Sequence, residues 1–248
     1  VSLSRLEAYS ALDSTNSYLL AKQGADWPSG AVCLAEQQRA GRGRQGRSWL
    51  SPFAAGLAGS LLWRFPMLAA ALSGLSLATG IATARALYQI GVAEVGLKWP
   101  NDVGWRGRKL GGILLESGGK AGAFFVVAGV GLNIALPKSE ATAIDQPWVD
   151  LVEILGADRV SRNHLAALLI SNLIEIFVRF QQGGFADLAT EWARFDQVAG
   201  QQVRLNLPHT AVIGIARGVD ASGALLLETA DGRITPYIGG EISLRIKP

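Results

Sequence analysis

Cysteine is nearly absent from this sequence: Cys33 is the only one among 248 residues. A single cysteine excludes an intrachain disulfide, and a cysteine-based metal site would need more sulfur. Charged residues are also few, at 17% of the chain against 49% hydrophobic residues, which excludes a disordered chain. The net charge of +3 permits an anionic partner without establishing one, because the basic residues are not collected in a tail.

Long hydrophobic runs are missing as well. The most membrane-like stretch, Met67–Ala84, is broken by small polar residues and glycines and is followed by Arg85, so a buried helix is favoured. The chain also opens without the basic segment and apolar stretch of a secretory signal. We therefore expect a cytoplasmic location and no membrane partner.

The patterns that are present favour an α+β fold. Short apolar runs predict strands at Ala31–Ala35, Gly56–Phe65, Val95–Trp99, Lys109–Glu116 and Phe124–Ile134. Helical spacing predicts helices at Ala71–Ile90, near Phe185–Phe195, and after Ser161, where Leu165, Leu169, Leu173, Ile176 and Phe180 form one stripe.

After Asp196 the pattern changes to short strands separated by turn residues. The predicted strands are Val203–Leu205, Ala211–Arg217, Ala224–Glu228, Ile234–Tyr237 and Ile242–Arg245. Five strands in about fifty residues are typical of a small barrel of the SH3 type. We therefore expect two domains, residues 1–196 and residues 197–248.

The stretch AGRGRQGRSWLSP, residues 40–52, carries three arginines and three glycines within seven residues. A solvated basic loop, an RNA-binding segment and an anion-binding loop of an active site are all compatible with this composition. In the last case, glycine N–H groups converge on an anion and arginines donate to phosphate or carboxylate. RNA binding usually needs several repeats or a base-stacking platform, and here one copy is followed at once by Trp49 and Pro52.

Three later stretches add polar groups or glycines to predicted strands. KWPND, residues 98–102, places a lysine, an amide and a carboxylate at a strand end, either for ligand chemistry or as a surface ion pair. In RKLGGILLE, residues 108–116, Lys109 either contacts a ligand or is an edge-strand lysine that prevents pairing with another sheet. Its two glycines and those of AGVGLNI, residues 128–134, predict a flat, apolar slot, unless close packing alone explains them.

Taken together, these stretches resemble the biotin protein ligases of bacteria. The resemblance runs through STN (residues 14–16), GRGRQGRSW (41–49), KWPND, KLGGILLE (109–116), GVGLNI (129–134) and GGEISLR (239–245), in this order. The family loop usually reads Gly-Arg-Gly-Arg-Arg-Gly, and Gln45 stands at its third arginine, so this position is expected to hold the reactive intermediate less strongly. The amino-terminal DNA-binding domain of bifunctional members does not precede the catalytic part here, so we expect no repressor function and no specific DNA partner.

The resemblance implies a mixed-sheet catalytic domain of the biotin/lipoate ligase type followed by an SH3-like barrel. It also implies a two-step reaction, in which biotin and MgATP give biotinyl-5′-AMP and pyrophosphate, and a carrier lysine then takes the biotinyl group and releases AMP. The expected cofactors are ATP and Mg²⁺, with biotin as substrate. The expected partner is the biotin carboxyl carrier protein of acetyl-CoA carboxylase or of another biotin-dependent carboxylase, and a homodimer is compatible with the family.

The resemblance also assigns roles to individual residues. Biotin-binding residues would be Ser14, Thr15, Asn16, Gln38, Gly41, Arg42, Gly43, Arg44, Lys109, Gly112, Leu114, Gly129 and Gly131. Nucleotide-binding residues would be Arg44, Arg47, Trp49, Lys98, Asn101, Lys109, Asn133 and Trp148. Catalysis would rest on Arg42, Arg44, Lys109 and Asp102, with Asn101 and Asp102 on the magnesium side or Asp102 as proton acceptor for the attacking lysine.

Simpler explanations exist for several of these residues, and two other functions compete. Ser14, Thr15 and Asn16 could be a plain helix cap, and Trp148 a core residue. A lipoate-attaching ligase shares the catalytic fold but lacks the Gly-Arg-Gly-Arg loop. A non-catalytic nucleic-acid-binding protein would use the arginine loop alone.

Overall fold

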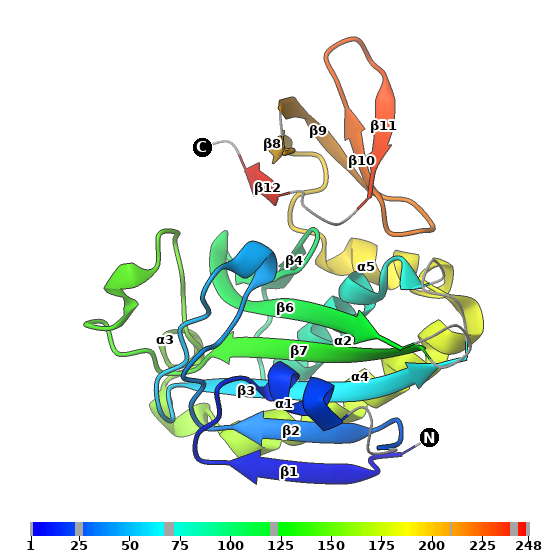
Figure 1. Cartoon of the computed structure of the whole chain (residues 1–248). Helices are drawn as coiled ribbons and strands as arrows, with labels where there is room; N and C mark the ends of the chain where they lie inside the picture. Colours follow the sequence, from blue (N-terminus) through cyan, green and yellow to red (C-terminus); the bar gives the residue numbers. More distant parts are fainter. Residues whose placement is uncertain are drawn as a thin grey trace.

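Two β-sheets organise the chain, a large one in the first part and a small one at the end (Figure 1). The computed structural model describes residues 2–22, 27–66, 72–119, 124–208, 210–238 and 243–246. The large sheet has seven strands in the order β1-β2-β3-β7-β6-β5-β4. The strands are β1 (Arg5–Tyr9), β2 (Ala31–Ala35), β3 (Gly56–Phe65), β4 (Val95–Lys98), β5 (Asp102–Trp105), β6 (Arg108–Gly118) and β7 (Phe124–Asn133). The pair β1–β2 is parallel and the other pairs are antiparallel, so the sheet is mixed.

Helices cover both faces of this sheet (Figure 1). The helix α1 (Thr15–Lys22) lies on one face against β2, β3 and β7, while α2 (Leu75–Gln89) and α4 (Arg162–Gly183) pack together on the other. Successive side chains of β3 point to opposite faces of the sheet. Leu61 and Trp63 belong to the core under α2 and α4, and Leu62 belongs to the core under α1. Shorter helices are α3 (Leu151–Leu155), α5 (Ala189–Phe195), η1 (Arg44–Gly46), η3 (Ala141–Ala143), η4 (Ala157–Arg159) and η5 (Ala186–Leu188).

The small sheet is antiparallel throughout, in the order β11-β10-β9-β8-β12. Its strands are β8 (Gln202–Asn206), β9 (Ala211–Val219), β10 (Leu225–Glu228), β11 (Ile234–Tyr237) and β12 (Ser243–Ile246). It is attached to the large sheet by the buried Trp99 indole, whose Nε1 donates to the Gly223 carbonyl at 3.0 Å. The division of the chain at residue 196 stays a prediction.

The predicted elements agree with the structure wherever an apolar pattern is uninterrupted. The strands at residues 31–35 and 56–65 have the predicted bounds, and the stripe of α4 is buried as expected. The helix predicted at Ala71–Ile90 is shorter, Leu75–Gln89, and residues 67–71 and 239–242 lie outside the described residues. Two strands were not predicted: β1 carries Arg5 and Glu7 among its five residues, and β5 has only four residues.

Length and composition alone would allow α4 to cross a membrane, and it is the one helix of the described residues that passes this test. Its apolar stripe, from Leu165 to Phe180, is buried inside the protein instead. The aromatic rings of Phe177 and Phe180 pack against Phe65 of β3, which is the behaviour of a core helix.

Candidate active site

A cavity of about 500 Å³ lies between the amino end of α1, the arginine–glycine loop and the strands β6 and β7. A second cavity of about 280 Å³ adjoins it, and Arg44, Arg47, Asn101 and Lys109 line both. The predicted site residues in the first cavity are Ser14, Thr15, Asn16, Gln38, Gly41, Arg42, Gly43, Arg44, Arg47, Trp49, Asn101, Lys109, Gly112, Leu114, Gly129, Gly131, Asn133 and Trp148. The remaining two, Lys98 and Asp102, line the second cavity. Segments distant in sequence therefore meet as predicted.

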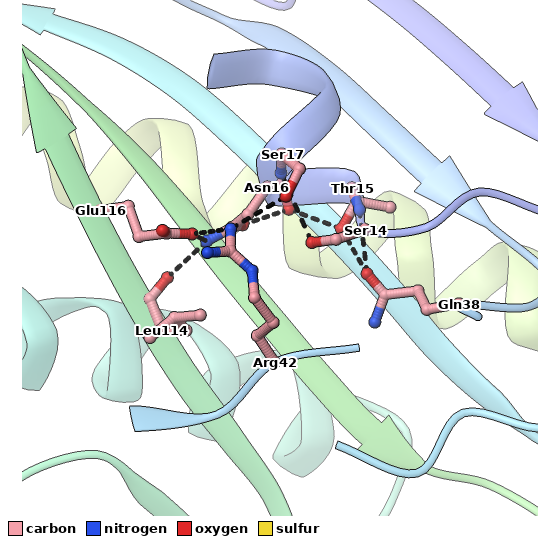
Figure 2. Close-up of polar contacts among 9 residues, drawn as sticks. Ser14, Thr15, Asn16, Ser17, Gln38, Arg42, Leu114 and Glu116 are labelled. Atoms are coloured by element: carbon pink, nitrogen blue, oxygen red, sulfur yellow. Dashed lines mark hydrogen bonds and ion pairs between the residues drawn. The ribbon is translucent and has the colours of Figure 1, made fainter. Parts of the chain in front are cut away.

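The amino end of α1 forms a polar wall whose donors and acceptors are fixed by its neighbours (Figure 2). The Gln38 Oε1 atom accepts from the Thr15 backbone N–H at 2.9 Å, which leaves the Gln38 amino group to donate to a ligand. The Ser60 hydroxyl lies 2.5 Å from Asn16 Oδ1 and 2.7 Å from Thr15 Oγ1. The Ser60 hydroxyl has one proton, which must go to Asn16 Oδ1 because that oxygen can only accept. The Thr15 hydroxyl therefore donates its own proton to Ser60 or Gln38. A lone pair of the Thr15 oxygen is left to accept a hydrogen bond from a ligand.

The Asn16 amide is held in one orientation from its other side (Figure 2). Its Nδ2 donates to the Leu114 carbonyl at 3.1 Å and to Glu116 Oε2 at 2.9 Å. Both partners can only accept, so the amide oxygen must face Ser60. Asn16 is 3% exposed, and burial gives each of these hydrogen bonds a high cost of loss. The STN segment therefore does more than cap α1, although Ser14 Oγ also accepts from the Ser17 N–H.

Two glycines of β7 are required by side chains that occupy the space of a Cβ atom. A Cβ on Gly129 would lie 2.3 Å from Asn16 Oδ1, and one on Gly131 would lie 2.6 Å from the Trp49 ring. Gly112 of β6 is different, because a Cβ there would meet Trp49 and Lys109 no closer than 3.5 Å. The glycine slot predicted from the sequence is thus partly filled by the protein's own Asn16 and Trp49.

The loop Gly41–Arg47 lines the cavity, with Arg42 and Arg44 in different environments. Arg42 NH2 donates to Ser17 Oγ at 2.9 Å and pairs with Glu116 at 2.7 Å. Arg44 reaches Asn101 Oδ1 at 3.3 Å, and burial, followed by repulsion from Arg47, lowers the pKa of its guanidinium. The Asp102 carboxylate opposes this lowering of the pKa, and the Arg44 guanidinium stays charged because arginine is so basic.

Gln45 lies at the tip of the same loop, with φ at 57° in the left-handed region. Its side chain is exposed, and it does not line the first cavity. The backbone around it is closed by the Gly43 N–H, which donates to the Arg47 carbonyl at 2.6 Å. The position that departs from the family pattern therefore points away from the cavity in this conformation.

Lys109, Lys98 and Asp102 form a charged cluster between the two cavities. Lys109 Nζ lies 2.6 Å from Asp102 Oδ1, and Lys98 Nζ lies 3.3 Å from Asp102 Oδ2. Burial raises the pKa of Asp102, but the two lysines outweigh it, and the net shift is downward. Asp102 is therefore ionised and neutralises only one of two lysine charges, which leaves net positive charge where the cavities meet.

The remaining residues connect this cluster to the segment after β7. The Asn101 amide donates to the Ile113 carbonyl at 3.0 Å, and the buried Asn133 amide donates to the Val149 carbonyl at 3.1 Å. The Lys109 N–H donates to the Pro147 carbonyl, and the Lys109 carbonyl accepts from the Val149 N–H. The Lys109 backbone is thus bonded to the residues on both sides of Trp148. Trp148 lines the first cavity and is only half-buried, so it is not a core residue.

Sequence comparison identifies the family to which these features belong. Residues 8–133 match the Biotin/lipoate A/B protein ligase family, and residues 198–245 match the Biotin protein ligase C terminal domain. The chain belongs to the biotin/lipoate A/B protein ligase family. It is 45% identical over 235 residues to the bifunctional ligase/repressor BirA of Escherichia coli K12, a match that covers 94% of this chain and 72% of BirA.

Other relatives place the chain among the biotin ligases of this family. The biotin–[acetyl-CoA-carboxylase] ligase of Mycobacterium tuberculosis is 36% identical over 97% of this chain and 90% of the relative. The structure of the biotin protein ligase from Aquifex aeolicus in complex with biotin and ATP superposes with a TM-score of 0.82 at 28% identity, covering 98% of this chain and all of that one. The predicted fold and family are confirmed.

Ser60 and Glu116 hold cavity-lining residues by hydrogen bonds but received no role from the sequence. Glu116 closes the quoted KLGGILLE stretch, and Ser60 is a lone hydroxyl among the apolar residues and glycines that lead up to Trp63 in β3. A buried polar residue in an apolar strand needs a partner, and that was the available signal for Ser60. Glu116 could not be paired in advance, because its partners lie about a hundred and about seventy residues away.

The described residues offer no dedicated magnesium cage. They contain no group of three histidine, cysteine or acidic side chains that could hold a metal ion. Asn101 Oδ1 accepts from Arg44, and each carboxylate oxygen of Asp102 faces a lysine. The side-chain oxygens of Asn101 and Asp102 are therefore already engaged and do not fit a protein-bound Mg²⁺ ion, which prefers free carboxylates and substrate phosphates.

Proposed function

We propose that this ligase activates biotin in the first cavity and transfers it to a lysine of a biotin carboxyl carrier protein. In the first step a biotin carboxylate oxygen bonds to the α-phosphorus of ATP, and the bond to the β-phosphate oxygen breaks and releases pyrophosphate. In the second step the carrier amine bonds to the acyl carbon, and AMP leaves. The observation that carries the proposal is a wall of fixed polarity that leads into a cluster of charged groups with net positive charge.

The polar wall suits the ureido ring of biotin. That ring presents one carbonyl acceptor and two N–H donors, and the wall offers the Gln38 amino group as donor and the Thr15 hydroxyl as acceptor. Ser60 contacts the Thr15 hydroxyl and is itself held by Asn16, while the Thr15 backbone N–H holds the Gln38 amide. A site built to pair with both kinds of group rejects compounds that lack them, because its own groups would stay unpaired.

The cationic cluster suits the reacting anions. Biotin's carboxylate and the α-phosphate repel one another, and Arg42, Arg44 and Lys109 bring positive charge to the place where they would meet. A Cβ atom on Gly41 would lie 2.5 Å from the Trp49 carbonyl oxygen, so this glycine lets the loop pack closely on itself, and the loop would keep water from the anhydride. Arg47, Trp49, Asn133 and Trp148 line the same cavity and would contact the nucleotide.

Asp102 fits best as the group that positions Lys109. Both its oxygens are engaged by lysines, and its pKa is lowered, so it is a poor acceptor for a proton from the carrier lysine. We infer that Mg²⁺ enters bound to the phosphates of ATP and that no protein carboxylate is reserved for it. Lys98 and Asn101 would face the phosphate side of this arrangement.

The named relatives point to the carrier of acetyl-CoA carboxylase as the protein substrate. A cytoplasmic location, a homodimer formed through the catalytic sheet and the lack of specific DNA binding are further parts of the proposal. Sedimentation tests the dimer. A gel shift at physiological salt tests DNA binding, because non-specific complexes are lost as salt rises and a specific complex is not.

Pyrophosphate release tests the first step directly. It should require both biotin and MgATP, and addition of an apo carrier domain should yield one biotinylated lysine and AMP. Thermal stabilisation by biotin, absent with lipoate, separates this function from that of a lipoate ligase. A chain that releases pyrophosphate equally with lipoate would contradict the proposal.

Replacing Arg44 should release the adenylate, whereas replacing Gln45 should not. Arg44 is half-buried beside Asn101 and would face the phosphate, so Arg44→Ala should speed escape of biotinyl-5′-AMP by about tenfold or more. Gln45→Arg adds the family's usual side chain at an exposed position outside the cavity and should change escape by less than about twofold. Loss of labelled adenylate on rapid gel filtration is the measurement, and retention increased severalfold by Gln45→Arg would show that the loop closes differently around its ligand.

A further inference from the structure

We propose that Glu116 is a positioning residue that fastens the arginine–glycine loop over the cavity through Arg42. The inference rests on the proposed function for its consequence, adenylate retention, but its geometry is that of the protein alone. Figure 2 shows the arrangement: Glu116 at the end of β6, Arg42 from the loop, and Asn16 and Ser17 at the start of α1. Three segments distant in sequence are tied at one carboxylate.

The contacts at Glu116 all converge on one oxygen. Its Oε2 accepts from Arg42 NH2 at 2.7 Å and from Asn16 Nδ2 at 2.9 Å. The same Arg42 nitrogen donates to Ser17 Oγ at 2.9 Å. Arg42 therefore reaches from the loop to the opposite side of the cavity mouth, where both of its partners belong to the rigid scaffold of α1 and β6.

The rest of the guanidinium is left for a ligand. Within the described residues, Arg42 has no further partner for Nε or NH1, so a ligand carboxylate could be bound without breaking the pair with Glu116. The negative charge of Glu116 also offsets part of the repulsion among the arginines of the loop. Arg42, Arg44 and Arg47 repel one another, and Glu116 is the acidic group that the structure pairs with any of these three.

The loop has other anchors, but they lie at different points. Its end is fixed by Trp49, which packs against Gly131, and Arg44 contacts Asn101 at 3.3 Å. Gly41 and Gly43 on either side of Arg42 give the backbone little stiffness of its own. Beside backbone hydrogen bonds such as that from the Gly43 N–H to the Arg47 carbonyl, the pair with Glu116 ties the first part of the loop, at Arg42, to the sheet, and losing it should loosen that segment selectively.

Trypsin provides a test that needs no substrate, because it cleaves after Arg42, Arg44 and Arg47. Glu116→Gln keeps an oxygen that can accept from Asn16 but removes the charge, and we expect cleavage in the loop to become about fivefold faster. Raising NaCl from low to high concentration should speed loop cleavage of the unaltered protein, since the side chains are 42% and 23% exposed, but should barely affect Glu116→Gln. Rates are normalised to an added unstructured peptide. Glu94→Gln is the control, because it breaks an exposed pair with Arg106 away from both cavities.

Two further measurements separate positioning from a general loss of structure. Escape of biotinyl-5′-AMP should rise about fivefold in Glu116→Gln, whereas the Kd for biotin without ATP should change by less than about threefold, because the Leu114 carbonyl still holds Asn16. Loop cleavage that is equal in the two proteins at both salt concentrations would overturn the proposal. If Glu116→Gln does not fold, the salt response of the unaltered protein decides alone, and its absence counts against the pair. A chain that makes no adenylate but shows the cleavage differences would refute the ligase function and leave the role of Glu116 standing.

Discussion

Lys109→Ala should slow formation of biotinyl-5′-AMP by at least about a hundredfold, equivalent to about 2.7 kcal/mol in the activation free energy. Lys109 Nζ lies at the junction of the two cavities, 2.6 Å from Asp102, and it would stabilise the charge that develops between carboxylate and α-phosphate. Asp102 keeps Lys98 as a partner in the variant, so the fold should survive. Single-turnover pyrophosphate release is the measurement.

The control for this experiment is Lys138→Ala, which removes an exposed lysine outside both cavities. It should release pyrophosphate at the unaltered rate. The thermal midpoint and the Kd for biotin of Lys109→Ala are measured alongside, to separate a slow chemical step from lost binding. Adenylation within about threefold of normal in a folded Lys109→Ala protein would remove this lysine from the mechanism.

Gly129→Ala should weaken biotin binding by about a hundredfold and lower the free energy of unfolding by about 1–3 kcal/mol. The added methyl group would lie 2.3 Å from Asn16 Oδ1, so Asn16 must move away from Ser60 and Glu116, and the wall loses its fixed polarity. Calorimetric titration with biotin and urea denaturation measure the two effects.

Two companion variants decide whether crowding of Asn16 is the cause. Gly112→Ala adds the same group to the neighbouring strand at ordinary contact distance and should change the free energy of unfolding by less than about 0.5 kcal/mol. In an Asn16→Ala background the space is vacated, so Gly129→Ala should then cost almost nothing in stability. A cost that is the same in both backgrounds would place the strain elsewhere.

Elements with a strong apolar pattern could be predicted from the sequence because burial, on both faces of a central strand or along one stripe of a helix, dictates their composition. The strands at residues 31–35 and 56–65 and the stripe of α4 are of this kind. The edge strand β1 could not, since it is short and mixes charged with apolar residues, and it exists because its backbone pairs in parallel with β2. The four-residue β5 is likewise formed by pairing between β4 and β6.

The candidate site was predictable as a set of residues but not as a set of contacts. Eighteen of the predicted residues line one cavity, and the roles that the resemblance implies for them stay a prediction. The sequence could not show that Gly129 and Gly131 make room for Asn16 and Trp49, or that both oxygens of Asp102 are taken by lysines. Those facts depend on which strands become neighbours and on where long side chains end.

The sequence by itself determined the ligase family, the mixed architecture and the clustering of arginines and glycines, because local patterns and block order survive without coordinates. Only the tertiary structure decided the polarity of the wall, the outward direction of Gln45, and the junction of Asn16, Arg42 and Glu116. The physical reason is the range of the interactions. Apolar periodicity acts over a few residues, whereas a hydrogen bond has meaning only once folding has brought its two partners within about 3 Å.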